Sequence, residues 1–312
     1  MQDMILKRLG PLTLLLLAAS FVLPAWLLAL TTVAFAKGLV VLGLLVLWRA
    51  GLVSFGQALY FAGGAYAAGL LAHGTGIHEA LILIFVGALA GALLAFVAGF
   101  LLARYRAIFF AMLSLAFSMI LYGILVKSVS LGSTDGIGLP PISFLGHLPG
   151  DEGRALPGYL LVVVVSFFAA VLVEYYLRSL PGSLAEPIRD NEVRVEYLGL
   201  SVKNLIHAKL VIAGALAGLG GAVTAITVGH IDPDSMAFWT ISGSFVFITI
   251  LAGSGSVMAP FVGALLFELV RSYAVAYAPE LWQLILGGAL LLVIMFLPGG
   301  LWSLFKRREA GT

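Results

Sequence analysis

The sequence predicts an all-α membrane protein, a polytopic bundle of about ten transmembrane helices. Of its 312 residues, 62% are hydrophobic and only 10% are charged, whereas a soluble domain keeps about a quarter of its residues charged. The mean hydropathy is +1.11, and apolar runs of about 20 residues, long enough to cross a bilayer as helices, recur from end to end. No room remains for a separate soluble domain, so residues 1–312 are expected to form one transmembrane domain.

About ten segments are predicted as spans. The first could instead be read as a secretory signal peptide, but its apolar run is longer than a signal core and Pro24 interrupts it. The eighth is the weakest, and it and the ninth could be half-helices that meet at residues 253–256. The predicted spans are 11–30, 32–48, 51–72, 80–103, 107–127, 159–178, 208–229, 238–253, 259–275 and 281–303.

The basic residues predict the orientation. With the N-terminus inside, 13 of the 17 Lys and Arg residues, Lys306, Arg307 and Arg308 among them, fall at or near cytoplasmic ends. The four exceptions are Lys37, Lys127, Arg154 and Arg271. Cytoplasmic loops of membrane proteins carry such an excess of positive charge. The pattern therefore predicts that both termini are cytoplasmic and that the number of spans is even.

Two polar segments interrupt the apolar pattern. Residues 128–158 are rich in Gly and Pro and are predicted to form an external loop of turns with one short helix. Residues 179–206 are predicted to form a cytoplasmic loop. Within it, residues 183–204 read SLAEPIRDNEVRVEYLGLSVKN, a dense run of charge in an otherwise apolar chain.

This charged run predicts a short amphipathic helix. Pro187 suits a first helical turn and Gly199 a helix stop, while Ile188, Val195 and Leu198 fall near one face. About ten residues are too few for a stable helix alone in water, so the helix needs a docking surface. Four acidic against three basic residues suit an anionic lipid surface poorly. A groove on a cytoplasmic partner is therefore favoured over lipid, with an ordinary solvated loop as the other alternative.

Small residues recur at every fourth position on several predicted spans. Such stripes let helix backbones approach closely, which compensates for the missing hydrophobic drive between helices in lipid. They are expected to pack helices together. The alternative is that they form an interface along which helices move during transport. The main stripes are Gly87, Gly91, Ala95 and Gly99 on the fourth span and Gly214, Gly218 and Ala222 on the seventh.

Charged residues within the spans suggest pairing. Glu174 and Arg178, four residues apart, are expected to form an ion pair that supports their helix. Glu268 and Arg271, three residues apart, are read either as a structural pair or as a contact on a transport path or with an external protein. Lys37 is placed near an external end, where its side chain would snorkel to the membrane surface.

Other candidate sites are few. Ser54, Gln57 and Tyr66 on the third predicted span either form hydrogen bonds across helices or line a path for a small zwitterion. The chain has no cysteine, its five histidines lack metal-ligand spacing, and no nucleotide-binding G-x-x-x-x-G-K-[ST] motif occurs. The sequence therefore predicts no catalytic residue, no metal, no cofactor and no nucleic-acid partner.

Several blocks together resemble the permease subunits of ABC importers for branched-chain amino acids, of the LivM type. They cover about residues 30–305, and jointly they are more specific than any one of them. The blocks are IRDNE (188–192) followed by Leu198-Gly199 and VIAGALAGLGGA (211–222), GLVSFGQALYFAGGAYAAGLL (51–71), IDPDS (231–235), LAGSGSVMAPFVGA (251–264) and FLPGGLW (296–302).

The resemblance implies how the charged run would work. It would be the coupling helix, which docks into a cleft of an ATPase subunit and carries ATP-driven closure to the spans. Ile188 and Leu198 would be apolar anchors of that contact. The remaining contacts would be Glu186, Arg189, Asp190, Asn191, Glu192 and Gly199.

The resemblance also implies partners and a substrate class. The expected partners are a second homologous permease of the LivH type, two ABC ATPase subunits, a periplasmic or extracellular substrate-binding protein and membrane lipid. The expected location is the prokaryotic inner membrane, which the chain would cross many times. Branched-chain or other hydrophobic amino acids are the expected substrates.

Three alternatives remain open at this point. Permeases of the same family carry urea, short amides or aromatic acids. A stand-alone secondary transporter would show inverted repeats and ionisable groups near the midplane, and no obvious repeat is found. An intramembrane enzyme would need a paired catalytic set, which the sequence does not suggest.

Overall fold

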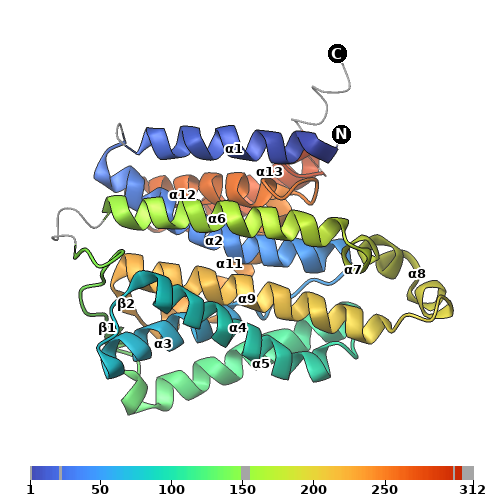
Figure 1. The fold of residues 1–312 in the computed structure, drawn as a ribbon, viewed down its shortest axis with the longest axis horizontal. Helices are drawn as coiled ribbons and strands as arrows, with labels where there is room; N and C mark the ends of the chain where they lie inside the picture. The colour runs from blue at the N-terminus through green and yellow to red at the C-terminus, as the bar shows by residue number, and fades with distance from the viewer. Residues whose placement is uncertain (1, 21–22, 149–154, 298, 304–312) are drawn as a thin grey trace.

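The computed structural model describes residues 2–20, 23–148, 155–297 and 299–303. In this part of the chain, ten helices of 14 or more residues run back and forth along one axis (Figure 1). Arg154 and Lys306, Arg307 and Arg308, which enter the predicted charge pattern, lie outside the described residues. The ten helices are α1 (Gln2–Ala19), α2 (Ala25–Arg49), α3 (Gln57–Thr75), α4 (Ala80–Leu102), α5 (Ala107–Lys127), α6 (Ala155–Arg178), α9 (Val202–Val228), α11 (Trp239–Ala252), α12 (Ala259–Tyr277) and α13 (Trp282–Phe296).

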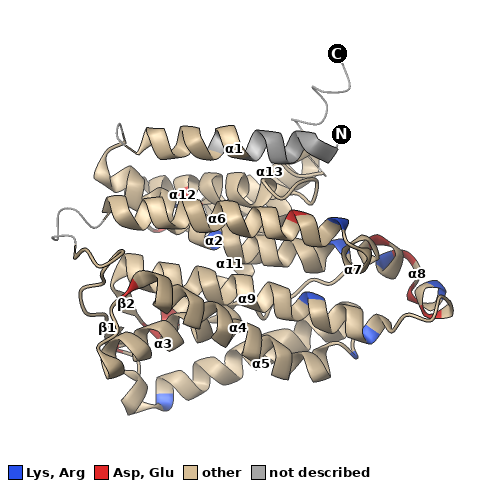
Figure 2. Ribbon diagram, viewed as in Figure 1, with Lys and Arg blue, Asp and Glu red and all other residues tan. Residues whose placement is uncertain are grey.

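Short elements distinguish the two ends of the bundle. One end, which we call the loop end, carries η1 (Val129–Leu131), β1 (Ile137–Gly138), β2 (His230–Ile231) and α10 (Pro233–Met236). The strands β1 and β2 form an antiparallel pair. The opposite end, which we call the α8 end, carries α7 (Leu180–Ser183) and α8 (Ala185–Tyr197), and charged residues gather on α8 (Figure 2).

The structure confirms an all-α, multi-pass membrane fold. Among the described residues, seven segments are helical, long and apolar enough to cross a membrane: α2, α4, α5, α6, α9, α12 and the segment Pro233–Ala252, which joins α10 and α11. The other predicted spans correspond to α1, α3 and α13. The total of ten spans and the cytoplasmic location of the α8 end stay predictions.

The first predicted boundaries are wrong. Spans 11–30 and 32–48 put a break near residue 31, but α1 ends at Ala19 and α2 begins at Ala25. Pro24 is extended, with φ −66° and ψ 153°, and directly precedes α2. Because proline lacks an N–H and disfavours a helical residue before it, Pro24 separates two helices instead of interrupting one.

The third and eighth spans also differ from expectation. The third begins at Gln57 instead of residue 51, because Gly51 follows the end of α2 in a left-handed conformation with φ +75°. Residues 253–258 form a turn between α11 and α12, and Arg49 Nη2 donates to the Ser254 carbonyl there at 3.1 Å. Since Arg49 ends α2 at the α8 end, this turn is not a mid-bundle junction of half-helices.

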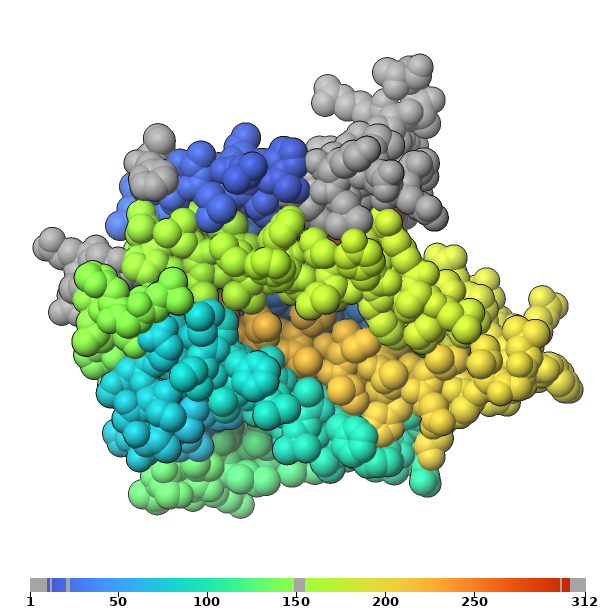
Figure 3. Space-filling view, viewed as in Figure 1, coloured from blue at the N-terminus to red at the C-terminus, as the bar shows by residue number. Residues whose placement is uncertain are grey.

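Helices α2 and α9 form the centre of the bundle. α9 packs along α2, α3 and α4, and α2 also packs along α6 and α12. By contrast, α4 and α5 turn large apolar side chains such as Phe85 and Phe109 outward, as lipid-facing helices do. A groove of about 430 Å³ between α4 and α6, with α9 as its floor, is lined by apolar side chains (Figure 3).

Glycines bring the backbones of α3, α4 and α9 into contact. A Cβ atom added at Gly218 of α9 would fall on the carbonyl oxygen of Gly87 and lie 2.9 Å from the Cα atom of Gly91. A Cβ atom at Gly64 of α3 would fall on Gly218 itself. Gly214 faces Gly91 in the same way. Whether this interface moves during transport stays a prediction.

One carboxylate at the loop end fastens a segment of the loop 128–154 to the start of α4. Glu79, directly before α4, accepts hydrogen bonds from the Ser143 hydroxyl at 2.8 Å and from the backbone N–H groups of Leu145 and Gly146 at 2.7 and 3.2 Å. The hydrogen bond from Ser143, with the two backbone bonds, holds the pKa of Glu79 below its usual value. The segment 143–146 is therefore fastened to the start of α4.

Candidate functional site

A row of polar side chains follows the inner face of α5. Ser114, Ser118 and Tyr122 recur at four-residue intervals, which places them on one face of the helix. The Ser114 hydroxyl accepts from the Phe55 N–H at 3.1 Å, and the Ser118 hydroxyl donates to the Ala237 carbonyl at 3.4 Å. The Tyr122 hydroxyl donates to Asp234 at 2.8 Å.

Residues 54–58 complete this arrangement, which we call the polar seam. Ser54 and Gln57 are fully buried, and the neighbouring Ala58 N–H donates to the Ser242 hydroxyl of α11 at 2.9 Å. Ser54 precedes α3, whereas we predict it within the third span. The polar seam therefore consists of Ser54, Gln57, Ser114, Ser118, Tyr122 and Ser242.

Three side chains in α3 carry buried polar atoms without a partner. Neither the amide nitrogen nor the amide oxygen of Gln57 has a hydrogen-bond partner among the described residues, and the same is true of the Tyr60 and Tyr66 hydroxyls. The structure thus shows none of the cross-helix hydrogen bonds that we consider for Gln57 and Tyr66. Tyr66 lies nine residues beyond Gln57, about 13 Å farther along α3 toward the loop end.

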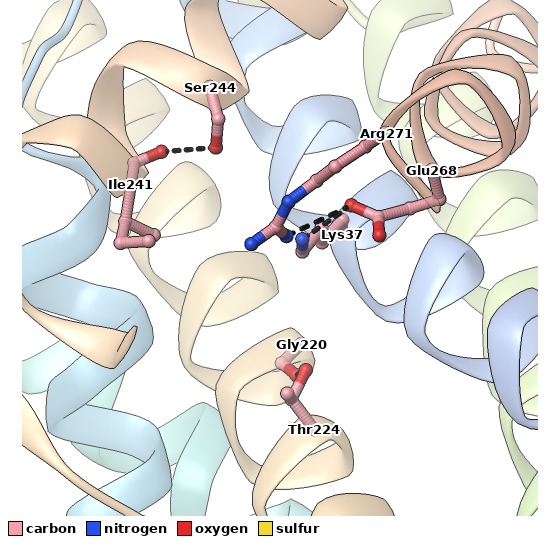
Figure 4. A network of polar contacts seen from close by, with 7 residues as sticks. All are labelled: Lys37, Gly220, Thr224, Ile241, Ser244, Glu268 and Arg271. Carbon is pink, nitrogen blue, oxygen red and sulfur yellow. Dashed lines mark hydrogen bonds and ion pairs between the residues drawn. The ribbon is translucent and has the colours of Figure 1, made fainter. Parts of the chain in front are cut away.

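A charge cluster joins α2 to α12 (Figure 4). Lys37 Nζ lies 2.5 Å from Glu268 Oε1, while Arg271 Nη1 lies 3.8 Å from the same oxygen. The Lys37 and Glu268 side chains are only 10% and 11% exposed. Glu268 therefore pairs first with a residue 231 positions away and only weakly with Arg271.

The snorkelling predicted for Lys37 is wrong. Because α2 begins at Ala25, Lys37 lies in the middle of this 25-residue helix and not near its end. Its buried ammonium group is paired with Glu268, which satisfies a charge that would otherwise be costly inside the bundle. The ion pair predicted between Glu174 and Arg178 on α6 is confirmed: Arg178 Nη2 lies 2.8 Å from Glu174 Oε1.

The helix α8 is bent. Asn191 has φ −163° and ψ 97°, which is extended backbone, so the helical phase is lost in the middle of α8. The single amphipathic face predicted for residues 187–199 is therefore wrong. Ile188 and Val195 are 5% and 1% exposed and belong to the chain's own core, whereas Leu198 is 73% exposed.

The α7–α8 segment is fastened to several helices. Arg106, in the turn between α4 and α5, pairs with Glu192 at 3.0 Å. The stem of Arg189 packs on Gly51 at the end of α2. The fully buried Lys209 of α9 donates to the Pro181 carbonyl of α7 at 2.6 Å. A displacement of α7 and α8 would therefore also displace the ends of α2, α4, α5 and α9.

Comparison with known proteins assigns this chain to a family. The profile of the family "Branched-chain amino acid transport system / permease component" matches residues 26–295. The chain belongs to this permease family. It is a membrane-embedded permease subunit of an ABC importer.

Two curated relatives agree with the family assignment. The permease is 27% identical over 292 residues to the high-affinity branched-chain amino acid transport system permease protein LivM of Escherichia coli (strain K12). The match covers 84% of the permease and 67% of that relative. LivM of Salmonella typhimurium matches with the same identity and coverage. No solved structure matches the permease.

The family match runs from the second residue of α2 to the last but one residue of α13, so it leaves out α1. The polar seam, the charge cluster and the α7–α8 segment all lie within residues 26–295 of the permease. The predictions from sequence do not include Ser114, Ser118, Tyr122 and Ser242, although the four-residue spacing of the first three on α5 is a usable signal. Among the described residues, no three His, Asp or Glu side chains gather to hold a metal ion.

Proposed function

We propose that this permease imports branched-chain or other hydrophobic amino acids together with a second homologous permease of the LivH type. Two ABC ATPase subunits would bind the α8 end, and an external substrate-binding protein would deliver the solute at the loop end. The observation that carries this proposal is the family match over residues 26–295, supported by two relatives whose names specify branched-chain amino acid transport.

The polar seam is the best candidate for part of the solute path. An amino acid carries an ammonium and a carboxylate group, so a path through an apolar bundle needs groups that donate and accept hydrogen bonds. Gln57 offers both an amide donor and an amide acceptor that no described residue uses. A buried polar group left without a partner costs about 1–3 kcal/mol, and a passing solute or water would supply the missing partner.

The α7–α8 segment is the best candidate for the ATPase contact. Leu198 and Tyr197, 73% and 87% exposed, offer apolar surface beside the charged residues of α8, while Ile188 and Val195 anchor the segment to its own core. In this arrangement Ile188 supports the contact from within instead of touching the ATPase. ATP binding would displace α7 and α8, and the fastenings at Arg106, Arg189 and Lys209 would pass the displacement to the spans.

Replacing Leu198 by aspartate tests this assignment. We expect association with the ATPase subunits to weaken about tenfold or more, because a desolvated apolar contact is replaced by a charge. The measurement is co-purification with the ATPases, followed by ATP-dependent uptake of radiolabelled leucine in proteoliposomes. Leu148→Asp is the matched control, since Leu148 is 61% exposed near the loop end. Undiminished association and uptake in the Leu198 variant would reject the coupling role.

A further inference from the structure

The guanidinium of Arg271 makes no hydrogen bond to any described residue. Its only ion-pair partner among them is Glu268, and that carboxylate is already engaged by Lys37 at 2.5 Å, while Arg271 stays at 3.8 Å. The Arg271 side chain is 41% exposed, about four times as much as the other two. A guanidinium has five N–H donors, so this one is left with its hydrogen-bonding capacity unused.

The cluster also carries an excess charge. Lys37 and Arg271 supply two positive charges, and Glu268 supplies one negative charge. On insertion scales, an unbalanced charge well inside a membrane helix costs about 2.5–3.5 kcal/mol. Such residues normally face a partner or a water-filled cavity. One further anion at Arg271 would make the cluster neutral.

The position of Arg271 suits a ligand that arrives from the loop end. It lies six residues before the end of α12, about 9 Å along the helix from that end. Its side chain reaches from α12 to the side of Lys37, and Ser244 of α11 and Thr224 of α9 lie on either side of the guanidinium in Figure 4. The Trp282 ring, 5.7 Å from the guanidinium carbon, forms an apolar wall on another side.

This location differs from the polar seam. Ser244, near Arg271, and Ser242, in the polar seam, are two residues apart on α11 and so face nearly opposite sides of that helix. Arg271 would thus contact the solute at a different place from Gln57 and Ser114.

We infer that Arg271 receives the carboxylate of the transported solute at the loop end of the permease. The planar guanidinium fork matches a carboxylate with two parallel hydrogen bonds, which the ammonium of a lysine cannot reproduce. Glu268 positions the fork while it neutralises Lys37. This inference rests on the proposed function, because it requires a solute that bears a carboxylate.

The test uses the complete importer in proteoliposomes, with the substrate-binding protein loaded with radiolabelled leucine. We expect Arg271→Gln to lower uptake about 10- to 100-fold, the range for hydrogen bonds to a charged group. Assembly with the second permease and stimulation of ATP hydrolysis by the binding protein should persist. Arg271→Lys, which keeps the charge and so protects folding, should give an intermediate rate. Lys127→Gln, which removes an exposed charge at the same end, should transport like the unaltered importer.

The outcomes separate this inference from the proposed function. Normal leucine uptake by both Arg271 variants would overturn the inference alone. Loss of the second permease from the complex of Arg271→Gln would also overturn it, because the missing carboxylate would then belong to a protein side chain. If the unaltered importer transported urea but no carboxylated solute, both proposals would fall together.

Discussion

Replacing Gly218 by valine should prevent the permease from packing its central helices. The new side chain would fall on the carbonyl oxygen of Gly87 and against the Cα atom of Gly91. Both are backbone atoms, which cannot turn aside as a flexible side chain can. Overpacking a well-packed core costs about 1–3 kcal/mol, and a clash with backbone belongs at or above the upper value. We expect little folded protein and a clearly lower melting temperature in detergent.

A matched glycine on α5 provides the control. At Gly123, an added Cβ atom would find nothing within 4 Å. Gly123→Val should therefore fold and melt like the unaltered permease, apart from a small gain in helix propensity that both variants share. Equal melting temperatures for the Gly218 and Gly123 variants would show that α3, α4 and α9 do not approach as closely as described.

Removal of the Glu268 charge should be the second large effect. Glu268→Gln leaves Lys37 and Arg271 near one another without an anion, and Lys37 is 8% exposed. Breaking a buried ion pair from one side costs about 3–5 kcal/mol, because a charge stays buried without compensation. The double variant Lys37→Met/Glu268→Gln removes both members of the buried pair, so it should recover most of the lost thermal stability.

An exposed pair controls for the loss of any carboxylate. Arg106 and Glu192 are joined at 3.0 Å, but their side chains are 30% and 38% exposed. Glu192→Gln should therefore change the melting temperature little, since exposed ion pairs contribute about 0–1 kcal/mol. If Glu268→Gln were as mild as Glu192→Gln, or if the double variant were no more stable than the single one, the buried cluster would not stabilise α2 against α12.

Features encoded in local sequence could be predicted, whereas features that depend on distant partners could not. The predicted span 107–127 matches α5 at both ends, because the charged residues Arg106 and Lys127 bound an uncharged, mainly apolar run there. The pair Glu174–Arg178 was predictable from its four-residue spacing. The environment of Lys37 could not be predicted, because its partner Glu268 lies on another helix, 231 positions away, and no local pattern joins them.

Two errors have a conformational cause. The prediction places Pro24 within one span, whereas its extended backbone separates two helices. The helical periodicity of the sequence does not predict the bend at Asn191, because assigning residues to helix faces assumes an unbroken helix. That bend turns Ile188 inward and leaves Leu198 outward, which changes the surface a partner would meet.

We expect the ATPase subunits to act on this permease through the α7–α8 segment. The chain contains no cysteine, so a single cysteine can be placed at Tyr197, which is 87% exposed on α8. In the assembled importer, a short thiol-reactive cross-linker should join Tyr197→Cys to an ATPase subunit, with a yield that changes on ATP binding. The control Leu145→Cys, 84% exposed near the loop end, should give no such product. Cross-linking of the ATPase from Leu145→Cys, or labelling of Tyr197→Cys by a membrane-impermeant reagent added outside intact cells, would contradict the account.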